Sequence, residues 1–268
     1  MEYTTVTSRK NDSIIWASKL SDKKYRDREN IFFVEGRKLV EEAIEADLKI
    51  KKLYFTAKAL ESYYDLLEKC GANEYFLVSD EVYEKLTDES SPQGIFACIE
   101  KFEIPMAEES DLKDGGFIIL EDIQNPLNLG AIIRCSYSLG GVSIILTKGC
   151  CDIFNPKALR GAMGSIFKTS FLVTDNLPTL IEGMKKSGNR VICTSLHTDS
   201  HILGKFEFKD SDSIVIGSEG KGISEETLMA CGESIIIPMV ENAESLNAAT
   251  ALSVLVWEMK KNSLLNKS

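Results

Sequence analysis

The chain has few of the residues that bind metal ions, and its cysteines do not suggest a disulfide framework. It contains 2 histidines and 7 cysteines in 268 residues, and no two cysteines are spaced as C-x-x-C. Structural zinc sites need clusters of Cys and His at short, regular spacings, so the sequence predicts no metal site. An odd number of cysteines, most of them in or beside apolar runs, is typical of reduced, buried thiols in a cytoplasmic protein.

Long apolar runs are absent as well. No stretch of 18 uncharged apolar residues occurs, and the first residues lack the basic-then-apolar layout of a signal peptide. We therefore expect no membrane partner. The apolar content of 44% and charged content of 27% are ordinary for a chain that buries a core, and the length suggests one or two domains.

Positive charge is in deficit, with a formal net charge of −10. That balance disfavours nucleic acid as a partner, because phosphates are bound by cations. The distribution weakens this argument, since basic residues crowd the first thirty positions: Arg9, Lys10, Lys19, Lys23, Lys24, Arg26 and Arg28. A basic N-terminal helix over about residues 11–20 could bind RNA, although a merely solvated basic face explains the same pattern.

An acidic stretch with Pro105, ending in Gly115-Gly116, divides the chain. We predict a small α/β domain over residues 1–103, a linker over 104–115 and a second domain over 116–268. Short apolar runs predict strands in the first domain at 31–34, 52–55, 75–78 and 95–99, with helices at 37–46, 58–69 and 80–86. Runs rich in Ile and Val predict strands in the second domain at 117–120, 142–146, 191–194, 213–216 and 234–237, with a weaker strand at 167–173.

The second domain thus has the layout of a doubly wound, mostly parallel sheet, in which ligands bind at the carboxyl ends of the strands. The last strand of this domain ends before Pro238, which stops the ladder. After a polar loop, Ser245 stands where an N-cap would stand, followed by Leu246-Asn247. The following helix carries an apolar stripe at Leu252, Leu255, Val256 and Met259.

Another polar loop follows the first strand of the second domain, at residues 121–134. Asn128 suits an N-cap, and Leu129, Ile132 and Ile133 form an apolar stripe that leaves Arg134 at its edge. We place Arg134 on the first turns of the helix, where a cation is unfavourable for the helix dipole, so a negatively charged partner would explain it. An ordinary surface ion pair is the alternative.

A glycine-rich loop, Gly217-Ser218-Glu219-Gly220-Lys221-Gly222, follows the strand at 213–216. It lacks the Lys-Ser/Thr of a P-loop, and Glu219 would repel phosphate. The carboxylate suits a cationic or hydrogen-bond-donating ligand instead. Taken alone, such a loop could equally be a simple turn.

Together the three loops resemble the signature motifs of the SpoU (TrmH-like) RNA ribose methyltransferases of the SPOUT superfamily: N-x-x-N-x-G-x-x-x-R, G-x-E-G-x-G and I-P-M followed by S-L-N. The stretch 155–167 resembles the family's inter-motif segment. Residues 33–43 and 91–94 resemble the substrate-binding domain often fused ahead of the catalytic one. Lys168-Thr169-Ser170 and Asn247-Ala248 depart from the commonest residues without removing a functional one.

The resemblance implies a SPOUT domain whose C-terminal segment forms a deep trefoil knot, and a homodimer with its site near the subunit interface. It implies S-adenosyl-L-methionine as cofactor, and RNA, above all rRNA, as substrate. The cofactor contacts it implies are Ser195, Leu196, Gly217, Gly222, Ile237 and Leu246.

The catalytic positions that the resemblance implies are Asn128, Arg134, Glu219, Ser245 and Asn247, acting in methyl transfer to a ribose 2′-OH. A guanidinium is a poor base, so we expect Arg134 to bind the flanking phosphate and stabilise a developing alkoxide. We expect Glu219, Ser245 and Asn247 to shape the cofactor loop and hold the target nucleotide. Recognition of a 2′-OH favours RNA over DNA.

Several alternatives stay open at this point. The enzyme could act on tRNA, or on an antibiotic site in rRNA. A non-catalytic RNA-binding assembly factor would have lost some of the catalytic positions, which are intact here. A nucleotide-binding oxidoreductase is disfavoured, because Ile123-Gln124-Asn125-Pro126 stands where a G-x-G-x-x-G motif would follow the first strand.

Overall fold

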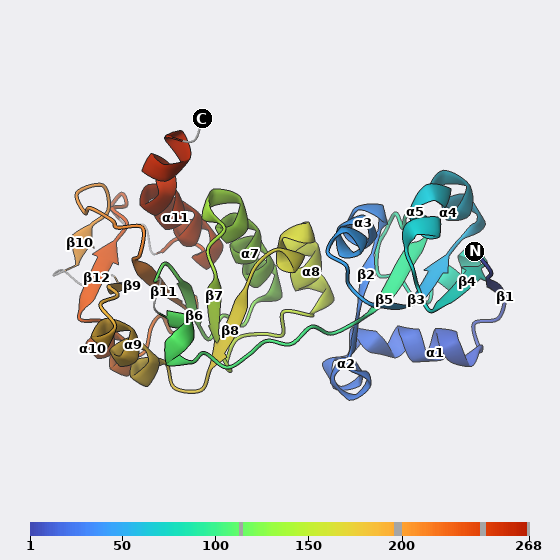
Figure 1. The fold of residues 1–268 in the computed structure, drawn as a ribbon, viewed down its shortest axis with the longest axis horizontal. Coiled ribbons are helices and arrows are strands. Elements are labelled where there is room, and N and C mark those ends of the chain that lie inside the picture. The colour runs from blue at the N-terminus through green and yellow to red at the C-terminus, as the bar shows by residue number, and fades with distance from the viewer. Residues whose placement is uncertain (113–114, 196–199, 242–244, 267–268) are drawn as a thin grey trace. The chain divides into compact units, whose positions relative to one another are not determined.

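The structure is a computed structural model that describes residues 1–112, 115–195, 200–241 and 245–266. The chain forms two compact units (Figure 1). Unit 1 comprises Met1–Glu103 and Phe154–Phe167, and unit 2 comprises Ile104–Ile153 and Lys168–Ser268. No helix within the described ranges is long and apolar enough to cross a membrane.

Unit 1 is built on a five-stranded sheet with the order β1-β4-β3-β5-β2, in which β5 runs antiparallel to both of its neighbours. The strands are β1 (Thr4–Val6), β2 (Ile31–Glu35), β3 (Ile50–Phe55), β4 (Glu74–Val78) and β5 (Ile95–Glu100). The helices are α1 (Asp12–Ser18), the 3₁₀ turn η1 (Lys19–Ser21), α2 (Lys23–Glu29), α3 (Arg37–Glu45), α4 (Ala57–Ser62), α5 (Tyr64–Lys69) and α6 (Asp80–Tyr83).

The strands of unit 1 bury side chains on both faces, because helices cover both. Tyr54 and Phe76 belong to a core cluster that also contains Ile14 and Ala17 of α1, and Val82 of α6. Alternate strand residues point to the opposite face. Leu53 and Phe55 are therefore turned away from this cluster, and both are fully buried. Helices α3, α4 and α5 cover that second face, as Figure 1 shows for α4 and α5 opposite α1.

A segment distant in sequence completes unit 1. Helix α8 (Pro156–Ala162) and the 3₁₀ turn η3 (Met163–Phe167) belong to it, although the sequence division placed them in the second domain. The ring of Phe154 lies 4.9 Å from that of Phe32, and a Cβ at Gly164 would overlap the Glu42 carboxyl group. Aromatic burial and this close approach hold the segment in unit 1.

Unit 2 is built on a seven-stranded parallel sheet with the order β10-β12-β9-β11-β6-β7-β8. Its strands are β6 (Ile118–Glu121), β7 (Ile144–Thr147), β8 (Phe171–Thr174), β9 (Val191–Thr194), β10 (His201–Ile202), β11 (Ser213–Gly217) and β12 (Glu233–Ile236). Its helices are the 3₁₀ turn η2 (Glu109–Leu112), α7 (Pro126–Gly140), α9 (Leu177–Lys186), α10 (Glu225–Cys231) and α11 (Ala248–Leu265). Helices α7 and α11 pack together on one face of the sheet, and α9 and α10 on the other (Figure 1).

The expected strands and the parallel sheet of the second domain are confirmed, and so is the buried stripe Leu252, Leu255, Val256 and Met259 of α11. The helix expected at 58–69 is instead two helices that meet at Tyr63. The acidic stretch after residue 103 does more than connect two domains. Met106 forms a parallel bridge with Val173, and the Ala107 N–H donates to the Val173 carbonyl at 2.9 Å.

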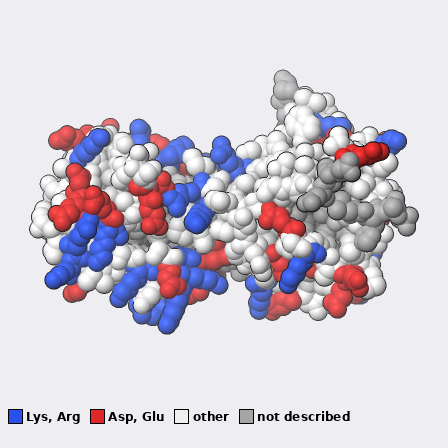
Figure 2. Space-filling view, turned by 180° about the vertical axis from the view of Figure 1, so that it is seen from behind, with Lys and Arg blue, Asp and Glu red and all other residues white. Residues whose placement is uncertain are grey.

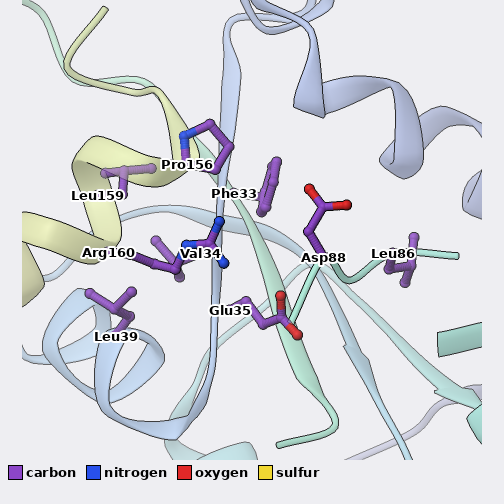
Figure 3. Close-up of a pocket in the computed structure, with 9 residues that line it drawn as sticks. All are labelled: Phe33, Val34, Glu35, Leu39, Leu86, Asp88, Pro156, Leu159 and Arg160. Atoms are coloured by element: carbon purple, nitrogen blue, oxygen red, sulfur yellow. The ribbon is translucent and has the colours of Figure 1, made fainter. Parts of the chain in front are cut away.

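Figure 3 shows a small pocket of unit 1 where α8 faces β2, between Val34, Glu35, Leu159 and Arg160. Its volume of about 20 Å³ leaves room for a single water molecule. Beside it, Glu35 Oε1 accepts hydrogen bonds from the Tyr83 hydroxyl at 3.1 Å and the Thr87 hydroxyl at 2.5 Å. Burial nevertheless raises the pKa of the Glu35 carboxyl, and these hydrogen bonds offset only part of the rise.

The raised pKa of Glu35 makes unit 1 sensitive to pH. Folding favours the protonated form of the carboxyl. Its contribution to stability is therefore complete at pH values below its pKa in the unfolded chain, and it is lost as pH rises through its pKa in the folded chain. Glu35→Gln keeps the acceptor without the charge. We expect the melting temperature of this variant, relative to that of the parent chain, to increase as the pH rises from 4 to 7. Glu68→Gln, at an exposed carboxylate, is the control, and a difference that does not change with pH would contradict this explanation.

Candidate functional site

Three loops that are far apart in the sequence meet in unit 2 at the carboxyl ends of β9, β11 and β12. They surround a cavity of about 450 Å³, which is within the range of small-molecule sites. Most of the residues that the sequence suggested for the cofactor and its loop line this cavity: Ser195, Gly217, Glu219, Gly222, Ile237, Ser245 and Leu246. Leu196 lies outside the described residues.

The glycine-rich loop folds back on itself at the cavity wall. The Gly222 N–H donates to the Ser218 carbonyl at 2.8 Å, and Gly222 has φ +69°, which favours glycine. A Cβ at Gly217 would overlap the backbone of Gly222, so no larger residue fits there. The loop is therefore a tight turn that presents its backbone and the Glu219 side chain beside the cavity.

Glu121 fixes the far end of this loop, a role that the sequence did not reveal. Its carboxylate accepts hydrogen bonds from the Ser224 hydroxyl at 2.7 Å, the Ser224 N–H at 3.2 Å and the Thr227 hydroxyl at 3.0 Å. Because Glu121 ends β6, which pairs with β11, these bonds tie the end of the loop to the sheet. A carboxylate at the end of a buried strand was the signal that could have identified it.

Three predicted catalytic residues share one hydrogen-bond network. The Asn247 amide nitrogen donates to Asn128 Oδ1 at 2.9 Å and to Glu219 Oε1 at 3.0 Å. The Asn128 amide nitrogen also donates to Glu219 Oε1. Two amides from two helices therefore hold one carboxylate oxygen, and hydrogen bonds to a charged acceptor are the stronger kind.

The helix caps at this site differ from those predicted. Asn247, not Ser245, caps α11, since its Oδ1 accepts from the N–H groups of Ala249 at 3.0 Å and Thr250 at 3.3 Å. Asn125, not Asn128, caps α7, because Pro126 suits the first helical position and the Asn125 side chain accepts from Leu127 N. Asn128 is thereby a buried residue inside the helix, free to use both ends of its amide toward the loops.

Arg134 lies apart from this network. Helix α7 begins at Pro126, so Arg134 is in its third turn and the argument from the helix dipole does not apply. It follows Asn128 by six residues, which places it about 9 Å further along the helix and roughly 120° around it. Its side chain is exposed, as expected, and within the described parts of the chain it has no hydrogen bond or ion pair.

The cavity fits a ligand with a nucleoside and a positively charged group. Apolar side chains line it, including Ile216, Ile235, Ile237 and Met239, and the Glu219 carboxylate stands at the glycine-rich loop. An apolar wall suits a flat ring, and a carboxylate suits a sulfonium or an ammonium group. Both features match S-adenosylmethionine.

Comparison with known proteins agrees with this chemistry. The sequence model of the SpoU rRNA Methylase family matches residues 116–257, and that of the MRM3-like substrate binding domain matches residues 11–97. The AdoMet-bound rRNA methyltransferase from Sinorhizobium meliloti has a similar structure, with a TM-score of 0.83 and 27% identity, covering 97% of this chain and 98% of that one.

Curated sequences are similar over almost the whole chain. The 23S rRNA (guanosine(2553)-2'-O)-methyltransferase RlmP of Bacillus subtilis is 29% identical, over 95% of this chain and 98% of its own length. The human rRNA methyltransferase 3, mitochondrial, is 26% identical, over 88% of this chain and 69% of its own length.

The fold and the site define an S-adenosylmethionine-dependent methyltransferase of the SPOUT class. The chain belongs to the SpoU rRNA Methylase family. The resemblance found in the sequence is thereby confirmed.

Two substitutions separate the two functions of Asn247. Asn247→Asp keeps the oxygen that caps α11 but turns a second carboxylate toward Glu219. We expect a melting temperature near that of the parent chain, because both side chains are exposed, and methyl transfer reduced at least tenfold. Asn247→Ala removes both functions and should also cost about 1 kcal/mol of stability.

Adding Glu219→Gln to Asn247→Asp supplies the control. The amide introduced at position 219 can then donate to the carboxylate introduced at position 247, so part of the methyl transfer should return. Measurement of methyl transfer by the single and double variants, with melting temperatures alongside, checks this. Full activity in the Asn247→Asp variant would show that the network does not position Glu219.

Proposed function

We propose that this chain methylates a ribose 2′-OH of ribosomal RNA, with S-adenosylmethionine as methyl donor. The observation that carries the proposal is the network of Asn128, Glu219 and Asn247 beside a nucleoside-sized cavity. Family membership and the printed activity of the Bacillus subtilis relative support the same reaction.

The residues of the site act mainly by alignment. When bound, S-adenosylmethionine supplies a methyl group that its sulfonium has already activated. Gly217, Gly222, Ile237 and Leu246 would hold the cofactor largely through the backbone, with Ser195 and Leu196 at the end of the neighbouring strand. Holding nucleophile and methyl group in line is worth several kcal/mol. The tight loop between β11 and α10, with Glu219 held by Asn128 and Asn247, would supply this alignment.

Glu219, Ser245 and Asn247 would keep the loop closed around the cofactor and hold the target nucleotide. Asn128 fixes the orientation of Glu219 from the buried side. Arg134 would bind the phosphate next to the target ribose. It would also stabilise the negative charge that develops on the ribose 2′-oxygen as the hydroxyl proton leaves to water or phosphate. A guanidinium stays protonated at neutral pH, so it acts as a cation and not as the base.

The placement of Arg134 supports a homodimer with shared sites. Leu127, Arg134 and Tyr137 lie on one side of α7, and the apolar side chains are 58% and 38% exposed. On the neighbouring helix α11, Val254 and Trp257 are 38% and 44% exposed. We infer that a second copy of the chain covers this face, so that Arg134 of one subunit serves the site of the other.

Unit 1 supplies a surface for RNA in this proposal. The expected basic helix at 11–20 is not basic, because α1 has no Lys or Arg, and the cations lie instead on η1 and α2, where Figure 2 shows Lys and Arg side chains. Lys19, Lys23, Lys24 and Arg28 are exposed there. The ring of Tyr25 lies 5.5 Å from the Lys19 ammonium and 4.9 Å from the Arg28 guanidinium. Cations grouped in this way neutralise phosphates without reading sequence.

Two further features belong to the proposal. The C-terminal segment would thread a loop of unit 2 as a trefoil knot, an arrangement that would bring the glycine-rich loop and the start of α11 side by side, as the contact between Asn247 and Glu219 does. The protein would act in the cytoplasm, where reduced thiols are the rule, and all seven of its cysteines are unpaired.

Labelled S-adenosylmethionine and purified RNA test the proposed reaction. Separate incubations with large-subunit rRNA, small-subunit rRNA and tRNA distinguish the possible substrates, and resistance of the methylated site to alkaline cleavage identifies a 2′-O-methyl group. We expect transfer to rRNA. Transfer to tRNA alone would favour the tRNA alternative, and cofactor binding without transfer to any RNA would favour a non-catalytic assembly factor.

Mixed dimers test the sharing of Arg134. Arg134→Ala chains and Asn247→Asp chains, each expected to be at least tenfold less active alone, are co-expressed with different tags. If each site takes Arg134 from the other subunit, every mixed dimer contains one intact site, and random pairing should restore about a quarter of the parent activity. No recovery in isolated mixed dimers would show that Arg134 serves its own chain.

A further inference from the structure

Unit 1 contains a second large cavity, separate from the one at the glycine-rich loop of unit 2. Its volume is about 400 Å³. Thr56 after β3, Lys58 and Tyr63 on and after α4, Asp80 on α6 and Gln93 before β5 line it. We call it the unit 1 cavity. Its size suits a single planar ring system with its sugar.

The cavity lies where the topology of unit 1 favours a ligand. Strands β3 and β4 are parallel neighbours, and both end at this edge of the sheet. Helix α4 leaves β3 toward one face, while α6 leaves β4 toward the face that carries α1 and the core cluster of Tyr54 and Phe76. Where neighbouring parallel strands send their connections to opposite faces, a crevice opens beyond their carboxyl ends. The α4 and α6 residues are the two sides of that crevice.

Hydrogen bonding prepares one wall of the cavity. Gln93 Oε1 accepts a hydrogen bond from the backbone N–H of Arg37 at 2.7 Å, which fixes the Gln93 side-chain amide and leaves its nitrogen as a donor. Within the described residues, that nitrogen, the Asp80 carboxylate and the Lys58 ammonium have no hydrogen bond or ion pair. Glu84, also in the lining, is paired with Arg9 at 2.6 Å. The lining of the cavity therefore includes donors and an acceptor that a ligand can use.

The lining also contains an aromatic ring and a lysine, Tyr63 and Lys58, and Arg37 lies next to the ring. Tyr63 is half-buried in the lining, and the Arg37 guanidinium lies 5.6 Å from the centre of its ring. Arg37 itself is largely exposed, with its only described ion pair a long one of 3.9 Å to Glu41. Asp80 and Glu84 disfavour a ligand that is only a phosphate. A flat ring with mixed donors and acceptors, joined to a phosphate that reaches Lys58 or Arg37, satisfies every group.

We propose that the unit 1 cavity binds one unpaired nucleobase of the RNA substrate. Tyr63 stacks on the base, Gln93 and Asp80 read its edge, and Lys58 and Arg37 contact the adjoining phosphates. Sequence-specific recognition of RNA depends on such unstacked bases, held on aromatic rings and bonded along their edges. The proposal rests on the proposed function for the identity of the substrate as RNA.

Neighbouring tyrosines supply a matched pair of variants. Tyr63→Ala removes the ring from the cavity, whereas Tyr64→Ala removes a 49% exposed ring that is not in the lining. Tyr63→Phe keeps the stacking surface. With the full chain and an rRNA transcript, we expect Tyr63→Ala and Gln93→Ala to raise both the Kd and the KM for RNA about tenfold, which is the scale of one lost base contact. The kcat and the affinity for S-adenosylmethionine should stay unchanged, and Tyr64→Ala and Tyr63→Phe should match the parent chain.

Two further measurements keep the outcomes distinct. If Tyr63→Ala melts early, Gln93→Ala and Asp80→Asn, both at exposed side chains, test the same cavity. If the parent chain transfers no methyl group, the proposed function fails. The RNA affinities of the parent and the variants can still be compared by filter binding, so the cavity is tested independently. RNA affinity and KM unchanged in Tyr63→Ala, Gln93→Ala and Asp80→Asn would overturn the proposal.

Discussion

The site depends on the side-chain amide of Asn247, because its oxygen and its nitrogen bind different elements. The oxygen caps the first turn of α11, and the nitrogen donates to Glu219 and Asn128. The position of the Glu219 carboxylate is therefore coupled to the start of the C-terminal helix. Through Asn128 it is also coupled to α7, which packs against α11. A shift in any one of these elements would break a hydrogen bond to the Glu219 carboxylate and change the position of that carboxylate beside the cavity.

Much of this arrangement could be predicted from the sequence, and the exceptions have physical reasons. Buried parallel strands are nearly continuous apolar runs, so β6, β9 and β11 were visible, and three motifs at strand ends predicted where a ligand would bind. The caps were not visible in the same way. Asn125 and Asn128 are both good capping residues, and only the fixed backbone of Pro126 decides between them. Residues 154–167 have no pattern of their own that assigns them to unit 1, because the aromatic contact of Phe154 with Phe32 depends on the tertiary fold.

The position of Arg134 shows that residues of one sequence motif need not lie side by side in the structure. The spacing N-x-x-N-x-G-x-x-x-R puts an asparagine and an arginine in one signature, which suggests that they act side by side. Helical geometry separates them by about 9 Å and roughly 120°. Asn128 is buried toward the loops, whereas Arg134 shares an exposed surface with Leu127 and Tyr137. One short motif thus contributes to two surfaces, and in the proposed homodimer both would meet one substrate.

A net charge of −10 constrains how such a chain can select its RNA. Non-specific affinity comes almost entirely from cations on phosphates, and it falls steeply with salt. The exposed cations of η1 and α2 are few, and Asp22 and Asp27 lie among them. An acidic protein with a small basic face gains little from phosphates anywhere along an RNA. Its choice of one nucleotide must then come from contacts that depend on the base, and in unit 1 the cavity with Tyr63, Gln93 and Asp80 offers those contacts. Weak non-specific attraction and a local base-binding site act together. Because the affinity for non-target RNA is low, the contacts of a single base can determine which RNA is bound.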